Sequence, residues 1–331
     1  MDKMWATLVH LTLNMWERKD NCMNWDHDSW RKLINECVKY RINTIVLDVA
    51  DGLQYKTHPE IAVDGAWSHE KMREEIALCK EKGITLIPKL NFSSVHDQWL
   101  GEYHYMLSTG IYYQICRDLI REVAELFDHP QYFHLGMDEE DHSHAITEEL
   151  VIYRQKELLF HDLRFLCDCV KEAGATPWVW HDNLFFTPKE FKAHISPDEV
   201  IISPWHYYAF REDHFTPVTK NEMIYNYYST GEFAKMNLSY VEEDPFFITF
   251  HRQAIPNAQY GYRYVPCASL CFTCEWNHRD LMEYFQQNAP DGSILGYMTA
   301  PWRVATDQQL EMYIQSFKSL DEARRIFCPN E

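Results

Sequence analysis

The chain has 331 residues, 46% of them hydrophobic, so it is long enough to bury a large core. Its 31 basic and 50 acidic side chains give a formal net charge of −19, and such a surface repels phosphate backbones and anionic lipids. No apolar run is long enough for a transmembrane helix. Nucleic acid and membranes are therefore not expected as partners, while small neutral or cationic substrates remain open.

Short apolar runs rich in β-branched residues alternate with amphipathic helical patterns along the chain. The predicted strands are Thr7–Leu13, Thr44–Val49, Thr85–Leu90, Tyr132–Gly136, Pro177–His181, Val200–Trp205, Tyr264–Ser269 and Ile294–Thr299. The predicted helices are Ser29–Tyr40, Glu70–Glu81, Tyr112–Phe127, Thr147–Ala173, Arg279–Gln287 and Thr306–Ile326. The second helix has both end signals, because Ser68 can cap its start and Gly83 can end it.

Eight strands alternating with helices predict a parallel sheet, and eight strands can close a barrel. We therefore expect residues 1–331 to form one α/β domain, a (β/α)8 TIM barrel. An open doubly wound sheet is the alternative, but no G-x-G-x-x-G follows the first strand. The stretch from Tyr207 to Tyr262 is too long for a plain crossover and is expected to extend over the barrel mouth.

The cysteines are expected to be mostly reduced, since five of them lie amid apolar residues of predicted helices. Cys271 and Cys274 form one C-x-x-C pair with no second pair, which argues against a structural zinc site. Reduced cysteines and the lack of a signal-peptide pattern favour a cytoplasmic location. A signal peptide that had been removed would instead make the protein periplasmic or secreted.

Polar and aromatic side chains follow most of the predicted strands, at the end of a barrel where active sites lie. The candidate site residues are His96, Asp97, Trp99, His134, Asp138, Glu139, Trp180, His181, Asp182, Trp205, Tyr207 and Trp302. Carboxylates among several tryptophans are more typical of a sugar site than of a phosphate site, which needs basic residues and glycine-rich loops. The expected partner is therefore carbohydrate.

The most informative segment runs from Tyr132 to Glu140, where an apolar strand ends in three successive acids. One interpretation is a solvated acidic loop or a helix start. The other is a pair of carboxylates for acid/base chemistry, since glycoside cleavage needs a proton donor and a group that stabilises the anomeric carbon.

This segment resembles the H-x-G-G-D-E motif of glycoside hydrolase family 20, the β-N-acetylhexosaminidases, with Met137 in place of the second Gly. The stretches 42–60 and 82–91 resemble the second and third strands of that family. His96 lies one residue later than the family's P-G-H histidine, and the stretch 178–182 resembles its fifth-strand W-x-E/D. Trp205 and Trp302 fall where the sixth and eighth strands of the family carry Trp.

The resemblance implies a retaining, substrate-assisted glycosidase. Asp138 would orient and polarise the 2-acetamido group, and Glu139 would be the general acid and then the base. Trp180, Trp205 and Trp302 would surround the acetamido group and the sugar, while Asp182 would bind hydroxyls.

The chain also departs from the family pattern. The first strand lacks the family's Arg, with Arg18 following too late, and Lys89 and Asn91 replace acids on the third strand. Two alternatives stay open: a glycosidase acting on a sugar without an acetamido group, and a catalytically silent glycan-binding barrel. No cofactor is expected, and no catalytic metal, because no H-x-H opens the first strand.

Overall fold

The computed structural model of the chain describes residues 3–15, 20–140, 152, 154–207, 256–270 and 275–331. Arg18, the Cys271 and Cys274 pair, and most of the expected extension after Tyr207 lie outside these residues.

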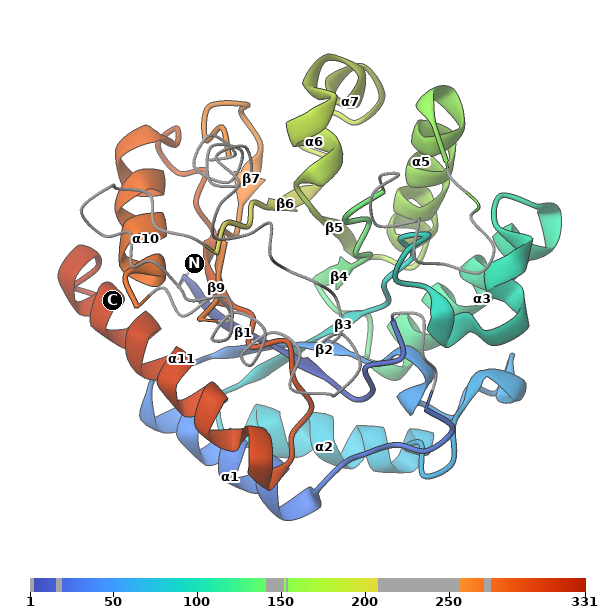
Figure 1. Ribbon diagram of the computed structural model, residues 1–331, viewed down its shortest axis with the longest axis horizontal. Coiled ribbons are helices and arrows are strands. Elements are labelled where there is room, and N and C mark those ends of the chain that lie inside the picture. The colour runs from blue at the N-terminus through green and yellow to red at the C-terminus, as the bar shows by residue number, and fades with distance from the viewer. Residues whose placement is uncertain (1–2, 16–19, 141–151, 153, 208–255, 271–274) are drawn as a thin grey trace, which may run out of the picture.

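The described residues form a single α/β domain around one parallel sheet. Its strands are β1 (Met4–His10), β2 (Thr44–Asp48), β3 (Thr85–Lys89), β4 (Tyr132–His134), β5 (Thr176–Trp180), β6 (Ile201–Ser203), β7 (Arg263–Tyr264), β8 (Cys267–Ala268) and β9 (Gly296–Thr299). They follow the order β7-β6-β5-β4-β3-β2-β1-β9-β8, with parallel pairing throughout. The sheet curls round and helices cover its outer side, an arrangement that fits a TIM-like barrel (Figure 1).

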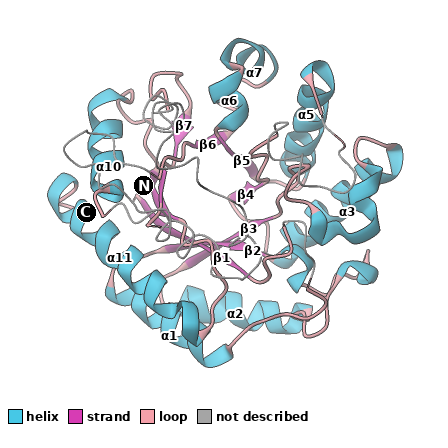
Figure 2. Ribbon diagram, viewed as in Figure 1, coloured by secondary structure: helices cyan, strands magenta, loops and turns pink. Residues whose placement is uncertain are grey.

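The predicted helices are present, five of them with ends within two residues of those expected. The helix expected over Thr147–Ala173 is described from Lys156 to Glu172, and residues 147–151 and 153 of that stretch lie outside the described residues. The helices are α1 (His27–Lys39), α2 (His69–Glu81), α3 (Gly110–Leu126), α5 (Lys156–Glu172), α6 (Asp182–Phe186), α7 (Pro188–His194), α10 (Asn277–Asn288) and α11 (Asp307–Phe327), with 3-10 turns at Ala50–Gly52, Pro59–Ile61 and Gln98–Met106 (Figure 2). The short α6 and α7 carry too few residues to show a helical period and were not predicted. No described helix has the length and apolar character needed to cross a membrane.

The predicted seventh strand is split by a proline. Pro266 has no N–H to donate, so the ladder breaks between β7 and β8. β7 pairs with β6, and β8 pairs with β9. The residues between them bond to both neighbours, since Val265 N donates to Ile202 O at 3.0 Å and Met298 N donates to Pro266 O at 2.9 Å.

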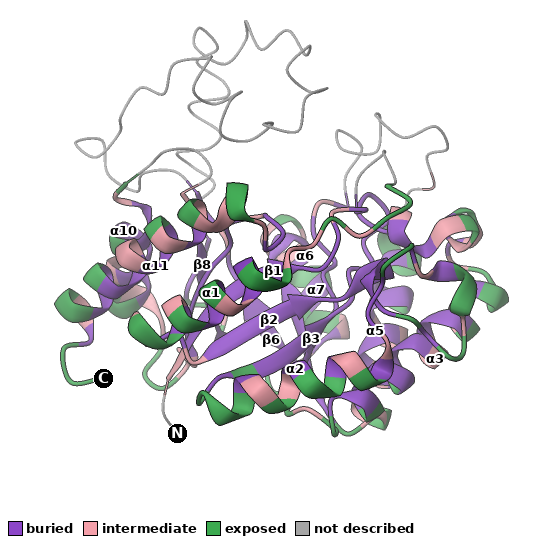
Figure 3. Ribbon diagram, turned by 90° about the horizontal axis from the view of Figure 1, so that it is seen from below, coloured by how far each residue is buried: buried purple, intermediate pink, exposed green. Residues whose placement is uncertain are grey.

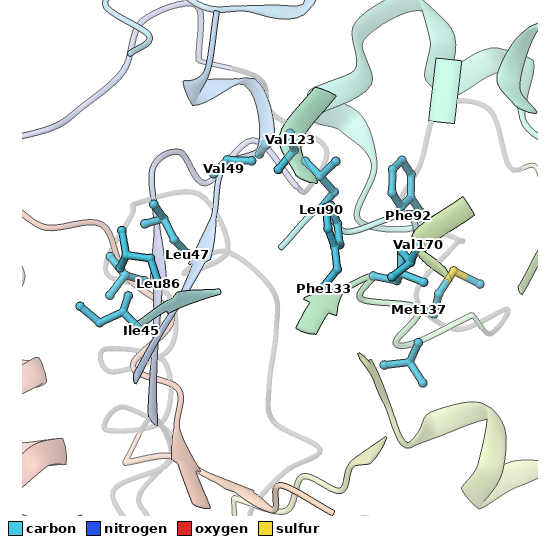
Figure 4. Close-up of a cluster of buried hydrophobic side chains, with 14 of the residues drawn as sticks. Ile45, Leu47, Val49, Leu86, Leu90, Phe92, Val123, Phe133, Met137 and Val170 are labelled. Atoms are coloured by element: carbon cyan, nitrogen blue, oxygen red, sulfur yellow. The ribbon is translucent and has the colours of Figure 1, made fainter. Parts of the chain in front are cut away.

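Both faces of the strands are buried, which explains why they read as continuous apolar runs. Figure 3 shows the strands in purple, the colour of buried residues, and much of the outer faces of the helices in green, the colour of exposed residues. Along β2, Ile45 and Leu47 join the large core under the helices, while Val46 joins a smaller cluster inside the curled sheet. The large core extends to Phe133 and Met137 on the fourth strand and its following loop (Figure 4).

Candidate active site

The loop after β4 has an unusual backbone that directs the acidic residues. Gly136, Met137 and Glu139 all have positive φ, at 72°, 65° and 54°. Such conformations are costly for residues other than glycine and persist where the surroundings impose them. Here Met137 N donates to Asn91 Oδ1 at 3.3 Å, and Asn183 Nδ2 donates to Met137 O at 3.2 Å. Residues that follow β3 and β5 therefore hold this loop from both sides.

The side chain of Met137 is fully buried in the large hydrophobic core, near Phe92 and Val170 (Figure 4). The bulk that replaces a glycine of the resembled motif is therefore accommodated by the core.

Asp138 and Glu139 share one histidine. His96 Nε2 lies 2.9 Å from Glu139 Oε2 and 3.5 Å from Asp138 Oδ2. Asp138 is buried and accepts a hydrogen bond from Asn91 Nδ2 at 2.9 Å, while 22% of the Glu139 side chain is exposed. The two neighbouring acids thus occupy different environments, one fixed and buried and the other reachable from solvent.

Asp182 brings a third carboxyl group to the site from the start of α6. It accepts the backbone N–H of Glu139 at 3.1 Å and the indole N–H of Trp205 at 2.8 Å. Burial and the charges of Asp138 and Glu139 raise the pKa of Asp182 to about 8. Asp182 is therefore largely protonated at neutral pH.

Aromatic rings form a connected wall beside these carboxyl groups. The ring centroids of Trp180 and Trp302 are 5.7 Å apart, those of Trp302 and Tyr207 are 6.2 Å apart, and Tyr207 stacks on Trp205 at 5.2 Å. Trp205 and Trp302 are partly exposed. Such rings can stack on the apolar faces of a sugar.

His181 lies against this wall, with its ring edge-on to Trp205 at 5.5 Å. Its Nδ1 accepts the backbone N–H of Trp205 at 3.4 Å. Burial, together with the charge of His206, lowers the pKa of His181 to about 3, so its imidazole is neutral at ordinary pH.

Three of the candidate residues have structural partners. Trp99 is fully buried and donates its indole N–H to Asn91 O at 2.8 Å. Asp97 is buried and pairs with His104. His134 is buried between Trp178 and Trp180, and its Nδ1 accepts the N–H of Gly136 at 3.0 Å. These contacts tie the three side chains to the loops around the site, and a role for them in binding sugar stays a prediction.

A row of ionisable side chains lies within the curled sheet. His10, Asp48, Lys89 and His134 are paired in register from β1 to β4, and all are buried. Lys89 Nζ donates to Asp48 Oδ2, and His10 Nδ1 lies 3.3 Å from the same oxygen. Burial opposes the charge of Asp48, but Lys89 and His10 outweigh it and lower the pKa of Asp48 to about 2.

Two residues that organise the site were not among the candidate site residues expected from the sequence. Asn91 bonds to both Met137 and Asp138, and its place two residues after β3 could have indicated this role. Arg154 is fully buried and pairs with Glu140. Arg154 lies within the predicted helix Thr147–Ala173, and no local sequence pattern distinguished it from the other polar residues of that stretch.

Three described residues have the spacing of metal ligands. His96, Asp138 and Glu139 each offer one ligand atom, and these atoms lie within 4.8 Å of one another. Imidazole and carboxylate are ligands that Zn²⁺ accepts. The same three groups also form the hydrogen-bonded set described above, and the expectation of a metal-free site remains a prediction.

No protein-family model matches the chain, and no curated protein matches it by sequence. Solved structures do match. A Vibrio harveyi family 20 exo-β-N-acetylglucosaminidase in complex with N-acetylglucosamine aligns over 99% of this chain and 58% of its own, at a TM-score of 0.57 and 14% identity. The Streptomyces coelicolor A3(2) family 20 β-N-acetylhexosaminidase aligns over 96% of this chain and 64% of its own, at a TM-score of 0.59 and 11% identity.

Dispersin B aligns over 97% of this chain and 98% of its own, at a TM-score of 0.55 and 15% identity. The chain thus spans less than two thirds of the Vibrio and Streptomyces proteins and nearly the whole of Dispersin B. At these identities the likeness establishes architecture, and the chain has the fold shared by the β-N-acetylhexosaminidases of glycoside hydrolase family 20.

Proposed function

We propose that the chain is an exo-acting β-N-acetylhexosaminidase that retains anomeric configuration through substrate assistance. The observation that carries this proposal is the pair of adjacent acids, buried Asp138 and partly exposed Glu139, joined through His96. Two adjacent acids suit a reaction in which the nucleophile belongs to the substrate. The similarity in fold to enzymes that act on N-acetylhexosamine supports the same assignment.

In the first step, Glu139 donates its proton to the glycosidic oxygen as the bond from that oxygen to the anomeric carbon breaks. The carbonyl oxygen of the 2-acetamido group attacks the anomeric carbon and forms a cyclic oxazolinium ion. Asp138 accepts a hydrogen bond from the acetamido N–H, which directs the carbonyl toward the carbon and stabilises the developing positive charge. The hydrogen bond from Asn91 fixes the Asp138 carboxylate for this task.

In the second step, Glu139 acts as a base. It removes a proton from water, which attacks the anomeric carbon from the side that the leaving group vacated. The oxazolinium ring opens and releases a sugar of retained configuration. The partial exposure of Glu139 lets it exchange protons with solvent, and His96 Nε2 at 2.9 Å can donate to its carboxylate or accept from its acid form.

The surrounding residues would bind and orient the sugar. Trp180, Trp205, Tyr207 and Trp302 would form the aromatic wall around the ring and the acetamido methyl group. Asp182 would hold Trp205 and the backbone of Glu139 and could also reach a sugar hydroxyl, with His181 placed beside it.

We also infer that the sheet closes into a (β/α)8 barrel with β7 and β8 as two halves of one strand. The bonds from residues 263–268 to both β6 and β9 support this arrangement. Closure would place all strand ends around one mouth, where the carboxyl groups and the aromatic wall lie.

The test is a screen of the purified protein on 4-nitrophenyl glycosides. It includes β-N-acetylglucosaminide and β-N-acetylgalactosaminide beside β-glucoside, β-galactoside and the α-linked analogues. We expect cleavage of the acetamido sugars alone, with inhibition by a thiazoline analogue of the oxazolinium ion.

Other outcomes would favour the alternatives. Turnover only of sugars without the acetamido group would contradict the substrate-assisted mechanism but retain a glycosidase. Binding of N-acetylglucosamine without turnover of any glycoside would indicate the silent glycan-binding barrel.

A further inference from the structure

Glu140, the third acid of the series, is enclosed by a network that the proposed reaction does not use. Its carboxylate is buried and accepts hydrogen bonds from Ser94 N at 2.8 Å and Ser94 Oγ at 2.9 Å. Arg154 forms an ion pair with the same carboxylate, and its Nε lies 3.3 Å from Glu140 Oε2. All four contacts to these oxygens come from donors, so the carboxylate of Glu140 is committed to this network.

Arg154 joins three parts of the fold. Its Nη2 donates to Phe92 O at 2.6 Å, on the loop after β3, and also to Glu140, on the loop after β4. Its Nη1 lies 3.4 Å from Asp162 Oδ2 on α5. Asp162 in turn accepts from Ser108 Oγ and Tyr113 OH, each at 2.6 Å. The guanidinium is fully buried, and although burial opposes its charge, the pairing with Glu140 raises the pKa of Arg154.

These two loops carry the reacting groups. Ser94, held by Glu140, lies two residues before His96, and Glu140 directly follows Glu139. Ser93 Oγ donates to the carbonyl of Asp138, which ties the same loops together a second time. A movement of Glu140 would therefore change the contact between His96 and Glu139, which spans 2.9 Å. The positive φ of Glu139 needs such external support to persist.

We propose that the buried Arg154–Glu140 pair is a positioning device that fixes Glu139 against His96, so that Arg154 and Glu140 act on the reaction through the geometry of Glu139. Arg154 is well suited to this role because its planar fork bonds to a carboxylate and a carbonyl at once, which a lysine cannot reproduce. The expected loss of turnover rests on the proposed function, whereas the expected change in the position of Glu139 against His96 does not.

The test compares Arg154→Met, Arg154→Lys, Arg154→Ala and the double variant Arg154→Met/Glu140→Gln with a control on α5, the helix that begins two residues after Arg154. Arg164 on that helix pairs with Glu199, outside the network around Glu140, and 35% of its side chain is exposed, so Arg164→Met is the matched control. Near-ultraviolet circular dichroism selects the variants that fold. Turnover of the 4-nitrophenyl β-N-acetylglucosaminide and the nitrogen-15 NMR titration of His96 are then measured for each.

Arg154→Met should lower kcat by about 10²-fold with a smaller change in KM, because a displaced acid impairs the reaction more than binding. It should also shift the pH limits of kcat and the His96 titration, and added guanidinium at millimolar concentration should restore part of kcat in Arg154→Ala. Arg154→Lys and the double variant should lie between Arg154→Met and the wild type, and Arg164→Met should match the wild type.

A folded Arg154→Met with unchanged pH limits and an unchanged His96 titration would overturn the proposal. If the wild type turned over no glycoside, the proposed function would fail, but the His96 titration would still decide the positional role. If the three single Arg154 variants failed to fold, the double variant, which leaves no unpaired buried charge, would decide it.

Discussion

The carboxyl group of Asp182 accepts the backbone N–H of Glu139 at 3.1 Å, so an acid after the fifth strand fixes the main chain of an acid after the fourth. The other oxygen of Asp182 accepts from Trp205 at 2.8 Å. One side chain therefore links three consecutive strands of the sheet at the candidate site. Its protonation state matters because it is buried beside two further carboxylates.

Asp182→Asn should flatten the dependence of stability on pH. The folded-state pKa of Asp182, about 8, lies above the ordinary value of about 4, so the folded protein holds this proton more tightly than the unfolded chain does. The resulting stabilisation is complete below about pH 4 and is lost as the pH rises through about 8. Asparagine keeps the acceptor for Glu139 N but does not titrate.

Thermal unfolding measured from pH 5 to pH 9 checks this expectation. The melting temperature of the wild type should fall more steeply over this range than that of Asp182→Asn. Asp198→Asn is the control, because Asp198 is exposed and a hydrogen bond from Ser196 Oγ lowers its pKa, so it stays ionised throughout. Parallel slopes for the wild type and Asp182→Asn would show that Asp182 is ionised at neutral pH.

Glu139→Gln and Asp138→Asn should each lower kcat on the order of 10²-fold or more, because both groups act on the reacting bonds. Glu139→Ala should regain activity with azide on substrates with good leaving groups, since protonation of the leaving oxygen is then dispensable and azide replaces the activated water. Asp138→Ala should gain nothing from azide. Equal azide rescue of both variants, or of neither, would contradict the assigned roles.

The backbone course of the site could be read from the sequence to a large extent. The fourth strand and its acids, the fifth strand before Asp182, and the body of α5 between them follow from apolar periodicity. The pairing of Arg154 with Glu140 could not be read in this way, since it depends on two segments that meet only in the folded chain. Trp99 illustrates the same limit, because composition cannot distinguish an indole in the core from one facing a sugar.

Gly136→Ala should destabilise the protein far more than Gly83→Ala. Both glycines have positive φ, 72° and 75°, so both substitutions carry the conformational penalty of roughly 1–2 kcal/mol. A Cβ at Gly83 would meet nothing within 4 Å, whereas one at Gly136 would lie 1.9 Å from Asn91 Oδ1 and 2.9 Å from Asn91 Cα. The difference between the free energies of unfolding of the two variants therefore measures the cost of this clash.

Urea unfolding gives the stability of each glycine variant, and kcat reports the site. Gly136→Ala should also lower kcat, because Asn91 holds Asp138. If the two variants had equal free energies of unfolding, the ends of β3 and β4 would be able to move apart without loss of stability.

Lys89→Met should be strongly destabilising, by about 3–5 kcal/mol, because it leaves the buried carboxylate of Asp48 without its counter-charge. The double variant Lys89→Met/Asp48→Leu removes both charges and should recover most of that loss. Lys39→Met, which breaks the exposed pair with Glu36, is the control and should cost less than about 1 kcal/mol. Urea unfolding at neutral pH measures all three free energies. If Lys89→Met cost no more than Lys39→Met, the row from His10 to His134 would not contain an ionised pair.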